Sequence, residues 1–421
     1  MAQGTIARKA ALDILRRVRA GVTFELALSA ATKGIQDLDR RLAHEISAGV
    51  LRSRTELDSH LRKLVSGKWD RTAPDLQDLL RIGTYQLTHL DRVPAFAAVQ
   101  ATVEVAKDVS GKGGAGLVNA VLRRVANGDL TVRSAEPVDD PEKLAEAFSH
   151  PEWLVKRWVE NHGVERTRAL LEHNNRRPNL VIRPVRWSSA KLSNRLSDLG
   201  IAWSTAPFSN GFVVVDEEVE NLPGYHEGAF VVQDPAQGQL LKHARIPDGA
   251  LVWDACASPG GKAAILSCRG PVVATELRAE RMGRLRETLN RVASSVPILR
   301  VDARHPPIAG KRIDVTLIDA PCSATGTLQR HPDGRWRLSE EMIRTAARLQ
   351  AELLGGATEA VHEGALLVYM TCSLEPEENF ELINQFLEKH SAFERDGEDL
   401  SLFPPDSGTD GGYAARLRRV S

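Results

Sequence analysis

Residues 249–266, GALVWDACASPGGKAAIL, join a short apolar run to a glycine-rich turn and a helical sequence. The run ALVWDA is typical of a buried strand, and the glycines of SPGGK let backbone amides approach a ligand where the next helix begins. Further apolar, β-branched runs follow along the chain: PVVATEL (271–277), PILRVDA (297–303), IDVTLID (313–319) and ALLVYMT (365–371). Helical sequences follow most of them, which predicts a doubly wound, mostly parallel sheet over residues 236–421.

The N-terminal part of the chain has a different pattern. Residues 1–126 read as a helical bundle, because apolar side chains recur at helical spacing, as Leu76, Leu79, Leu80, Leu87 and Leu90 do. The polar, acidic residues 127–147 are predicted to be a linker. Residues 148–235 are predicted to form a small α/β module with strands NLVIRPV (179–185), IAWSTAP (201–207) and GFVVVDE (211–217), and with a helix in SSAKLSNRLSDLG (188–200) capped by a serine.

Composition excludes several classes of protein. Hydrophobic residues make up 42% and charged residues 26%, as in an ordinary soluble protein. The N-terminus lacks the apolar core of a signal peptide, and no stretch reaches the roughly 18 apolar residues of a membrane span. We therefore expect a cytoplasmic protein with no membrane partner. The four cysteines form no CxxC pair, which argues against a disulfide framework and against a metal site.

Charge is balanced overall but not along the chain. The formal net charge is zero, yet residues 1–129 contain 20 Lys and Arg against 14 Asp and Glu. In EHNNRRPN, the side chains of Arg176, Arg177 and Asn179 are candidates to contact a phosphate chain. A solvated helical surface and a solvated basic loop would explain the same residues, so both interpretations stay open.

Acids follow two of the predicted strands, at the edge where ligands of such sheets bind. Glu276 is suited to a ribose diol, and Asp302 could accept a hydrogen bond from an adenine amino group. A helix cap or a solvated turn would explain either acid alone. The glycine loop is not a P-loop, because Ala263 stands where Ser or Thr would follow the lysine. Together these residues favour an adenosine-type ligand without a triphosphate.

Two cysteines follow the fourth and fifth strands. Cys322 and Cys372 lie in turn sequences, which predicts that both reach one crevice, whereas Cys268 reads as a packing residue within a helix. A thiol beside an adenosine ligand suits methylation of a pyrimidine at C5, because addition of a thiolate to C6 makes C5 nucleophilic. Asp319 is placed to stabilise charge on the ring. These residues do not decide which thiol attacks.

Three motifs, DACASPGGK (254–262), DAPCSATGTLQRHPD (319–333) and TCSLEPEEN (371–379), resemble the signatures of the Sun/RsmB family of RNA cytosine-C5 methyltransferases, which use S-adenosylmethionine. SGKGGAGLVNAVLRR (110–124) is similar to the NusB-like RNA-binding domain of its bacterial branch, and DGGYAARLRR (410–419) resembles the final strand. The resemblance implies a NusB-like bundle, an RNA-recognition-like α/β module and a Rossmann-like methyltransferase domain. It implies an enzyme of the type that modifies cytosine 967 of 16S rRNA. Nothing in the sequence suggests more than a monomer.

The resemblance also implies roles for individual residues. Cys372 becomes the nucleophile, and Cys322 assists removal of the C5 proton and release of the product. Asp319 contacts both the base and the methyl donor. The other residues implied to bind the methyl donor are Cys256, Ala257, Ser258, Pro259, Gly260, Gly261, Lys262, Glu276 and Asp302. Transfer RNA as substrate and a non-catalytic RNA-binding factor are the alternatives, and DNA is not expected as a partner.

Overall fold

The structure, a computed structural model, describes residues 4–65, 69–129, 139–215, 217–293, 295–306 and 312–421. These residues divide into two compact units. Unit 1 comprises Met1–Arg176 together with Leu328–Arg337, and unit 2 comprises Arg177–Thr327 together with Leu338–Ser421. The chain therefore leaves unit 2 after Thr327, contributes ten residues to unit 1, and returns. The predicted domain boundaries at residues 126, 147 and 235 stay predictions.

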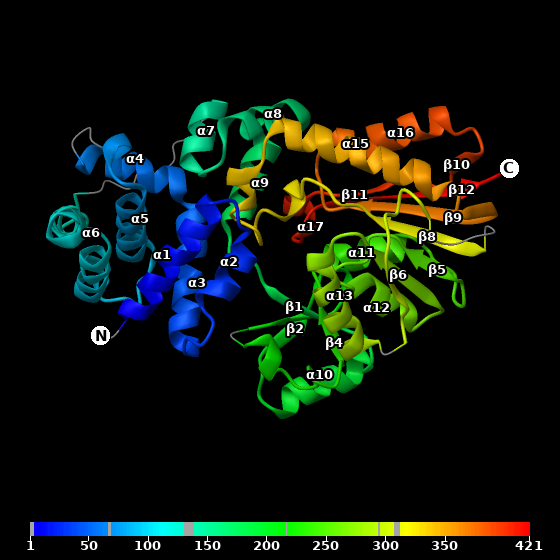
Figure 1. The fold of residues 1–421 in the computed structure, drawn as a ribbon, viewed down its shortest axis with the longest axis horizontal. Helices are drawn as coiled ribbons and strands as arrows, with labels where there is room; N and C mark the ends of the chain where they lie inside the picture. The colour runs from blue at the N-terminus through cyan, green and yellow to red at the C-terminus, as the bar shows by residue number, and fades with distance from the viewer. Residues whose placement is uncertain (1–3, 66–68, 130–138, 216, 294, 307–311) are drawn as a thin grey trace. The chain divides into compact units, whose positions relative to one another are not determined.

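Unit 1 is helical, as the apolar periodicity predicted (Figure 1). Its longer elements are α1 (Thr5–Arg19), α2 (Phe24–Ala31), α3 (Asp37–Arg52), α4 (Arg54–Leu64), α5 (Pro74–His89), α6 (Ala95–Ala126), α7 (Pro141–Ala147), α8 (Glu152–His162) and α9 (Val164–Asn175). The apolar faces of α1–α6 share one core, in which Leu79 and Leu80 are fully buried and Leu76 packs at the margin. Helix α6 is broken at Gly111, whose φ of 66° suits a residue without a side chain.

The predicted linker contains a helix. Of residues 127–147, positions 130–138 lie outside the described residues. Helix α7 occupies the end of this range, and its first turn is capped by the carboxylate of Asp140, which accepts hydrogen bonds from the backbone amides of Glu142 and Lys143. The proline at its first position suits a helix start, because its missing N–H has no partner there in any case.

Leu328–Arg337, called the inserted segment below, packs within unit 1 and ends in the short helix α14 (Gly334–Arg337). Arg335 is fully buried and donates hydrogen bonds to the backbone oxygens of Ser149 and Asn174 and to Oδ1 of Asn175, at 2.7–3.1 Å. The carboxylate of Asp333 accepts the backbone N–H of Phe24 at 3.1 Å. Burial, with a smaller contribution from the charge of Arg52, lowers the pKa of Arg335 to about 9.

Unit 2 begins with a four-stranded antiparallel sheet in the order β2-β3-β1-β4. The strands are β1 (Leu180–Pro184), β2 (Trp203–Thr205), β3 (Phe212–Val214) and β4 (Phe230–Val232). The first three were predicted, whereas β4 was not. Helix α10 (Ser189–Asp198) packs Leu192 and Leu196 into the core of this sheet. Its predicted serine cap is confirmed: Oγ of Ser188 accepts the backbone N–H of Lys191 at 3.2 Å.

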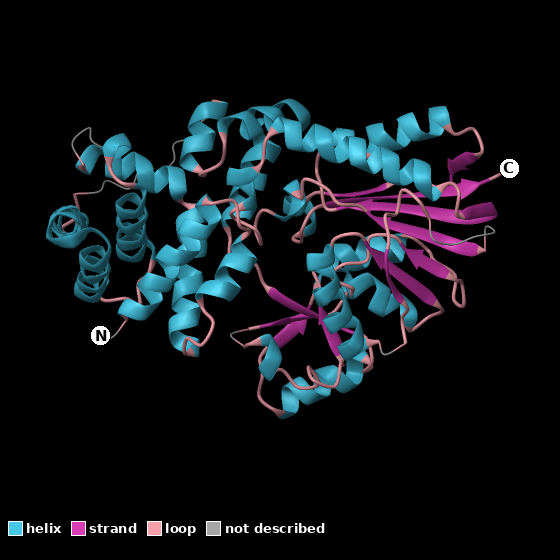
Figure 2. Ribbon diagram, viewed as in Figure 1, coloured by secondary structure: helices cyan, strands magenta, loops and turns pink. Residues whose placement is uncertain are grey.

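The second sheet of unit 2 runs in the order β10-β12-β9-β8-β5-β6-β7, with β11 paired to β12 (Figure 2). Its strands are β5 (Val252–Asp254), β6 (Val272–Glu276), β7 (Ile298–Arg300), β8 (Ile313–Asp319), β9 (Val361–Thr371), β10 (Phe393–Arg395), β11 (Leu400–Leu402) and β12 (Gly412–Arg419). Strands β5 to β9 pair in parallel, and β10 to β12 are antiparallel. The predicted mostly parallel sheet and its closing strand are therefore confirmed.

Helices cover both faces of this sheet (Figure 1). On one face lie α11 (Pro235–His243), α12 (Gly261–Ser267) and α13 (Ala279–Val292), and on the other lie α15 (Glu340–Ala357) and α16 (Phe380–Lys389). Adjacent strand residues divide between the two cores: Val252 packs on the first face and Trp253 on the second. Strands buried on both faces need continuous apolar runs, which explains the sequence pattern from which they were predicted.

Candidate active site

The order of the strands brings the sequence motifs to one edge of the sheet. The parallel part of the sheet begins with β5. The chain then places β6 and β7 on one side of β5 and β8 and β9 on the other, so the strand order reverses between β5 and β8. Ligands of such sheets bind at the carboxyl ends of the strands, at this point of divergence. The ends of β5, β6, β8 and β9 carry Asp254, Glu276, Asp319 and Cys372.

The two cysteines predicted to share a crevice are in contact. Sγ of Cys322 lies 3.3 Å from Sγ of Cys372. Cys322 stands in the loop after β8, and Cys372 directly follows β9, its neighbour in the sheet. The loops are also joined by their backbones, because the N–H of Gly326 donates to the oxygen of Cys372 at 2.9 Å.

The hydrogen bond that the Cys372 thiol makes with Cys322, together with burial, raises the pKa of Cys372 well above that of a free thiol, although Lys262 opposes the shift. Cys372 is therefore a neutral thiol at neutral pH in this structure. A thiolate is the reactive form of cysteine, so the arrangement needs a proton acceptor during attack.

Lys262 joins the glycine-rich loop to the strand that precedes Cys322. Its Nζ donates to Oδ2 of Asp319 at 2.6 Å and also contacts Oε1 of Gln237 on α11. Lys262 is largely buried and the Asp319 side chain is 28% exposed, so this pair is partly shielded from water. Asp319, in turn, lies close enough to Cys372 to raise its pKa.

Asp254, at the end of β5, is a buried acid that the sequence analysis did not single out. Its side chain is fully buried, and neither carboxyl oxygen has a hydrogen-bond partner of normal geometry among the described residues. Burial, with a contribution from nearby Asp319, raises its pKa to about 7. The signal that identified Glu276 and Asp302, an acid at the tip of a strand, would have found Asp254 as well.

The glycine-rich loop connects β5 to α12. The N–H of Ala257 donates to the backbone oxygen of Thr275 at 2.9 Å, which ties the loop to β6. Gly260 has a φ of 107°, and a Cβ there would lie 3.1 Å from Leu285, so only glycine is accommodated. At Gly261 a Cβ would have only Nε2 of Gln233 within 4 Å, at 3.6 Å. This side of the loop is therefore open to a ligand.

Three carboxyl groups surround the start of this loop. Burial and the charges of Asp254, Asp319 and Glu276 all raise the pKa of Cys256, which is consequently a neutral thiol. Lys262 is a cation within the same group. Three acids facing one lysine favour a positively charged ligand, because a further cation would relieve their mutual repulsion.

The two acids predicted to bind an adenosine ligand both make local turns. One oxygen of Glu276 accepts the backbone N–H of Arg278 at 2.8 Å. The carboxylate of Asp302, just beyond β7, accepts the backbone N–H of Arg304 at 3.1 Å and is ion-paired with its guanidinium at 2.7 Å, which lowers the pKa of Asp302. Asp302 therefore has to share its carboxylate, or exchange this partner, in order to bind a ligand.

The structure also shows polar residues under the two cysteines that the sequence analysis missed. Glu378 is fully buried and accepts hydrogen bonds from Ser323 and Ser373, the residues after the two cysteines, and from Gln350 of α15. The motif TCSLEPEEN contains Glu375, Glu377 and Glu378, of which Glu375 and Glu378 are fully buried, and its sequence does not indicate which of them contacts both cysteine loops.

The predicted RNA-contacting residues lie at the junction of the units. Arg176 is the last residue of the first part of unit 1, and Arg177 is the first residue of unit 2. Arg176, Arg177 and Asn179 are exposed in the loop between α9 and β1. Their contact with RNA stays a prediction.

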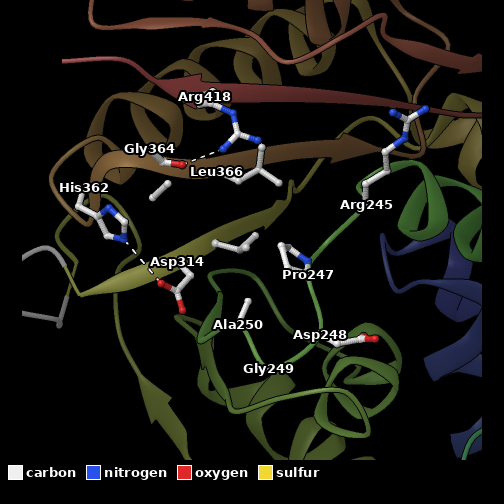
Figure 3. Close-up of a pocket in the computed structure, with 12 residues that line it drawn as sticks. Arg245, Pro247, Asp248, Gly249, Ala250, Asp314, His362, Gly364, Leu366 and Arg418 are labelled. Carbon is white, nitrogen blue, oxygen red and sulfur yellow. Dashed lines mark hydrogen bonds and ion pairs between the residues drawn. The ribbon is translucent and has the colours of Figure 1, made fainter.

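A cavity of about 410 Å³ lies at the opposite edge of the sheet (Figure 3). Ala250 precedes β5, and Asp314 and Leu366 lie in the first halves of β8 and β9, so these lining residues mark the amino ends of the strands. Arg245, Arg418 and His362 also line it, together with Asp248 and Asp314. The cavity is remote in the sheet from the cysteines and is not part of the candidate active site.

No group of three or more His, Cys, Asp or Glu side chains in the described ranges could hold a metal ion. No helix in the described part of the chain is both long enough and apolar enough to cross a membrane.

Comparison with known protein families matches most of the chain. Residues 244–418 match the family model "16S rRNA methyltransferase RsmB/F", residues 5–127 match the NusB family, and residues 150–220 match the ferredoxin-like domain of RsmF/B-like methyltransferases. The chain is 33% identical to ribosomal RNA small subunit methyltransferase B of Vibrio cholerae, over 97% of this chain and 96% of that protein.

Solved structures with low sequence identity share the fold. The crystal structure of PH0851 superimposes with a TM-score of 0.83 at 22% identity, covering 100% of both chains. The crystal structure of NSun6 from Pyrococcus horikoshii with SFG has a TM-score of 0.58 at 18% identity, covering 64% of this chain and 98% of that one. The expected helical bundle, small α/β module and Rossmann-like domain are confirmed by these matches together with the observed topology.

Proposed function

Because the chain belongs to the 16S rRNA methyltransferase RsmB/F family, we propose that it transfers a methyl group from S-adenosylmethionine to C5 of a cytosine in 16S rRNA. The observation that carries the proposal is the 3.3 Å separation of the Cys322 and Cys372 thiols, at the carboxyl ends of β8 and β9. The name of the Vibrio cholerae relative describes a methyltransferase of small-subunit ribosomal RNA, which supports this substrate. The match of the helical bundle to the NusB family supports an RNA substrate as well.

Cys372 is the proposed nucleophile. C5 of cytosine is too weak a nucleophile to take a methyl group directly, and addition of a thiolate to C6 makes C5 reactive by splitting one difficult step into two easier ones. Since Cys372 is a neutral thiol, its proton has to leave as the bond to C6 forms.

Asp319 is proposed to stabilise the charge that develops on the cytosine ring while Cys372 adds to it. A carboxyl group near N3 of cytosine stabilises the charge that develops there, and Lys262 at 2.6 Å holds Asp319 in place. This hydrogen bond orients the Asp319 carboxylate before the base arrives.

Cys322 is proposed to act after methyl transfer. Once C5 is methylated, its remaining proton has to be removed before Cys372 can leave C6. Cys322, whose sulfur touches that of Cys372, is the group placed to assist this elimination. Removing Cys322 would then trap the enzyme on its product.

S-adenosylmethionine, when bound, supplies the methyl group from a positively charged sulfonium. The residues proposed to hold it are Cys256 to Lys262, with Glu276, Asp302 and Asp319. The open side of Gly261 and the unpaired oxygens of Asp254 support a cationic ligand at this loop. Glu276 is assigned to the ribose and Asp302 to the adenine amino group.

The RNA has to present an unpaired or flipped cytosine, because the reacting carbon is hidden in a stacked helix. Arg176, Arg177 and Asn179 are proposed to contact its backbone. The protein is proposed to act as a monomer, and cytosine 967 is the proposed target.

The test is a comparison of wild type, Cys372→Ala and Cys322→Ala, each incubated with 16S rRNA and labelled S-adenosylmethionine. Denaturing gels reveal covalent protein–RNA adducts. We expect an adduct that accumulates with Cys322→Ala and is absent with Cys372→Ala. The reverse pattern would exchange the roles of the two thiols. Methyl transfer to transfer RNA but not to 16S rRNA would change the substrate, and absence of any transfer would favour a non-catalytic RNA-binding factor.

A further inference from the structure

A buried carboxylate links the two cysteine loops. Glu378 is fully buried, and it makes no ion pair with any residue that the structure describes; its carboxylate accepts hydrogen bonds from uncharged groups. Oε2 accepts the backbone N–H of Ser323 at 2.9 Å and Nε2 of Gln350 at 2.8 Å. Oε1 accepts the hydroxyl of Ser373 at 2.7 Å, and it also accepts the hydroxyl of Ser323.

These donors belong to residues next to the two thiols. Ser323 directly follows Cys322, and Ser373 directly follows Cys372. The Gln350 side chain donates a second hydrogen bond to the backbone oxygen of Pro321, the residue before Cys322, at 2.9 Å. Glu378 therefore contacts the Cys322 loop directly at Ser323 and indirectly at Pro321, through Gln350. It contacts the Cys372 loop at Ser373.

Direct bonds between the loops complete the network. The hydroxyl of Ser373 lies 3.1 Å from that of Ser323 and 3.3 Å from that of Thr325. Oγ1 of Thr325 accepts the backbone N–H of Leu374 at 2.9 Å. All of these groups belong to unit 2.

The burial of Glu378 has to be compensated. Burial raises its pKa, and the hydrogen bonds from Ser323, Ser373 and Gln350 oppose that shift. Both donors on Oε2 are N–H groups, which cannot reverse direction to accept a proton from the acid. An apolar residue would fill the same space without the free-energy cost of burying a charge. We therefore explain the carboxylate by the two cysteine loops, whose donor groups its oxygens hold in place.

We propose that Glu378 is a positioning residue that keeps the Cys322 and Cys372 thiols in contact during the reaction. This role rests on the proposed function, because it matters only if one thiol forms the bond to the base and the other assists its release. A carboxylate that accepts from both loops at once sets the separation of the two sulfur atoms, and neither loop can move without breaking a buried hydrogen bond.

Three variants test the role, all in a Cys268→Ser background that removes the exposed thiol. Glu378→Gln keeps the shape of the side chain but places an N–H₂ group against donors. Ser373→Ala removes the hydroxyl through which Glu378 holds the Cys372 loop, together with the contacts of that hydroxyl to Ser323 and Thr325, and keeps the test available if Glu378→Gln fails to fold. Glu388→Gln is the control, because Glu388 is an exposed glutamate on α16, the helix that begins two residues after Glu378.

The first measurement reports thiol separation and needs no substrate. A short bifunctional thiol reagent is added to each protein, and the yield of the linked Cys322–Cys372 peptide is read by mass spectrometry. We expect a high yield with the control and a reduced yield with Glu378→Gln and Ser373→Ala. An unchanged yield in both folded variants would overturn the proposal.

The second measurement reports the reaction. Because displacement of reacting groups by about 1 Å costs about 100-fold in rate, we expect kcat for methyl transfer to 16S rRNA to fall by that order in Glu378→Gln. The dissociation constant for S-adenosylmethionine should stay at the control value. Variants with fewer linked peptides but unchanged kcat would overturn the proposal. If the control itself transfers no methyl group, the proposed function fails, and the peptide yields still decide whether Glu378 holds the thiols together.

Discussion

The ammonium group of Lys262 lies 2.6 Å from Oδ2 of Asp319, so the end of the glycine-rich loop is joined to the end of the strand that leads to Cys322. Both residues come from motifs that are separated along the chain, and the parallel pairing of β5 with β8 brings them together. A change at either residue is therefore expected to affect both the ligand loop and the cysteine loop.

Asp319→Asn is expected to lower methyl transfer more than it lowers binding of the methyl donor. The amide keeps the shape of the side chain but loses the charge that stabilises the reacting ring. Loss of one such electrostatic contact lowers kcat by about 10²–10³-fold. Single-turnover rates and calorimetric titration with S-adenosylmethionine separate the two effects. Equal losses in rate and affinity would indicate that Asp319 serves the methyl donor alone.

Asp254 gives the fold a predictable dependence on pH. Its pKa is raised from 3.8 to about 7 in the folded protein, so between these values the folded state binds the proton more tightly than the unfolded state. The free energy of unfolding contributed by this group therefore falls as pH rises from about 4 to about 7.

Asp254→Asn should remove that dependence. The free energy of unfolding of the variant relative to wild type is expected to be on the order of 3 kcal/mol higher at pH 8 than at pH 5. Urea unfolding followed by the fluorescence of the tryptophans, which include the neighbouring Trp253, measures the gain. The same difference between the two proteins at both pH values would contradict the raised pKa.

The four cysteines should differ in their reaction with iodoacetamide. Cys268 is exposed and is expected to be alkylated first. Cys256 should react later than Cys268, because it is partly buried, and burial together with three nearby carboxyl groups raises the pKa of its thiol. Timed alkylation followed by peptide mass spectrometry gives the order. Rapid modification of Cys256 would show that the glycine-rich loop opens in solution.

Arg335→Met is expected to destabilise unit 1. The change leaves the backbone oxygens of Ser149 and Asn174 buried without their donor, which costs about 1–3 kcal/mol for each unsatisfied group. Thermal unfolding measures the loss, and Arg344→Met on the exposed face of α15 is the control. Equal melting temperatures for the two variants would mean that the inserted segment adds nothing to the stability of unit 1.

The sequence predicted those parts of the site that follow directly from strand order. An acid or a cysteine after a buried strand has to reach the carboxyl edge of a parallel sheet, and this reasoning located Glu276, Cys322 and Cys372. It did not identify Glu378, because that residue turns inward from a loop rich in acids. Strands β4, β10 and β11 were not predicted, whereas β2, β3, β5 and β7, which also have three residues each, were recognised from the longer apolar runs that contain them.

The destination of the inserted segment was also beyond sequence reasoning. Residues 328–337, LQRHPDGRWR, have the polarity of a surface loop. Nothing in their composition indicates that Arg335 is fully buried or that Asp333 caps the backbone of Phe24. Such long-range partners depend on how the whole chain folds, and local pattern does not contain that information.

The inserted segment has a consequence for synthesis on the ribosome. Domains generally fold in order from the N-terminus as the chain emerges. Here the N-terminal unit contains Leu328–Arg337, so its packing stays incomplete until most of unit 2 has been translated. For the same reason the first 176 residues are not a cassette that can be exchanged between proteins: removing them would leave the guanidinium of Arg335 without the acceptors that permit its burial.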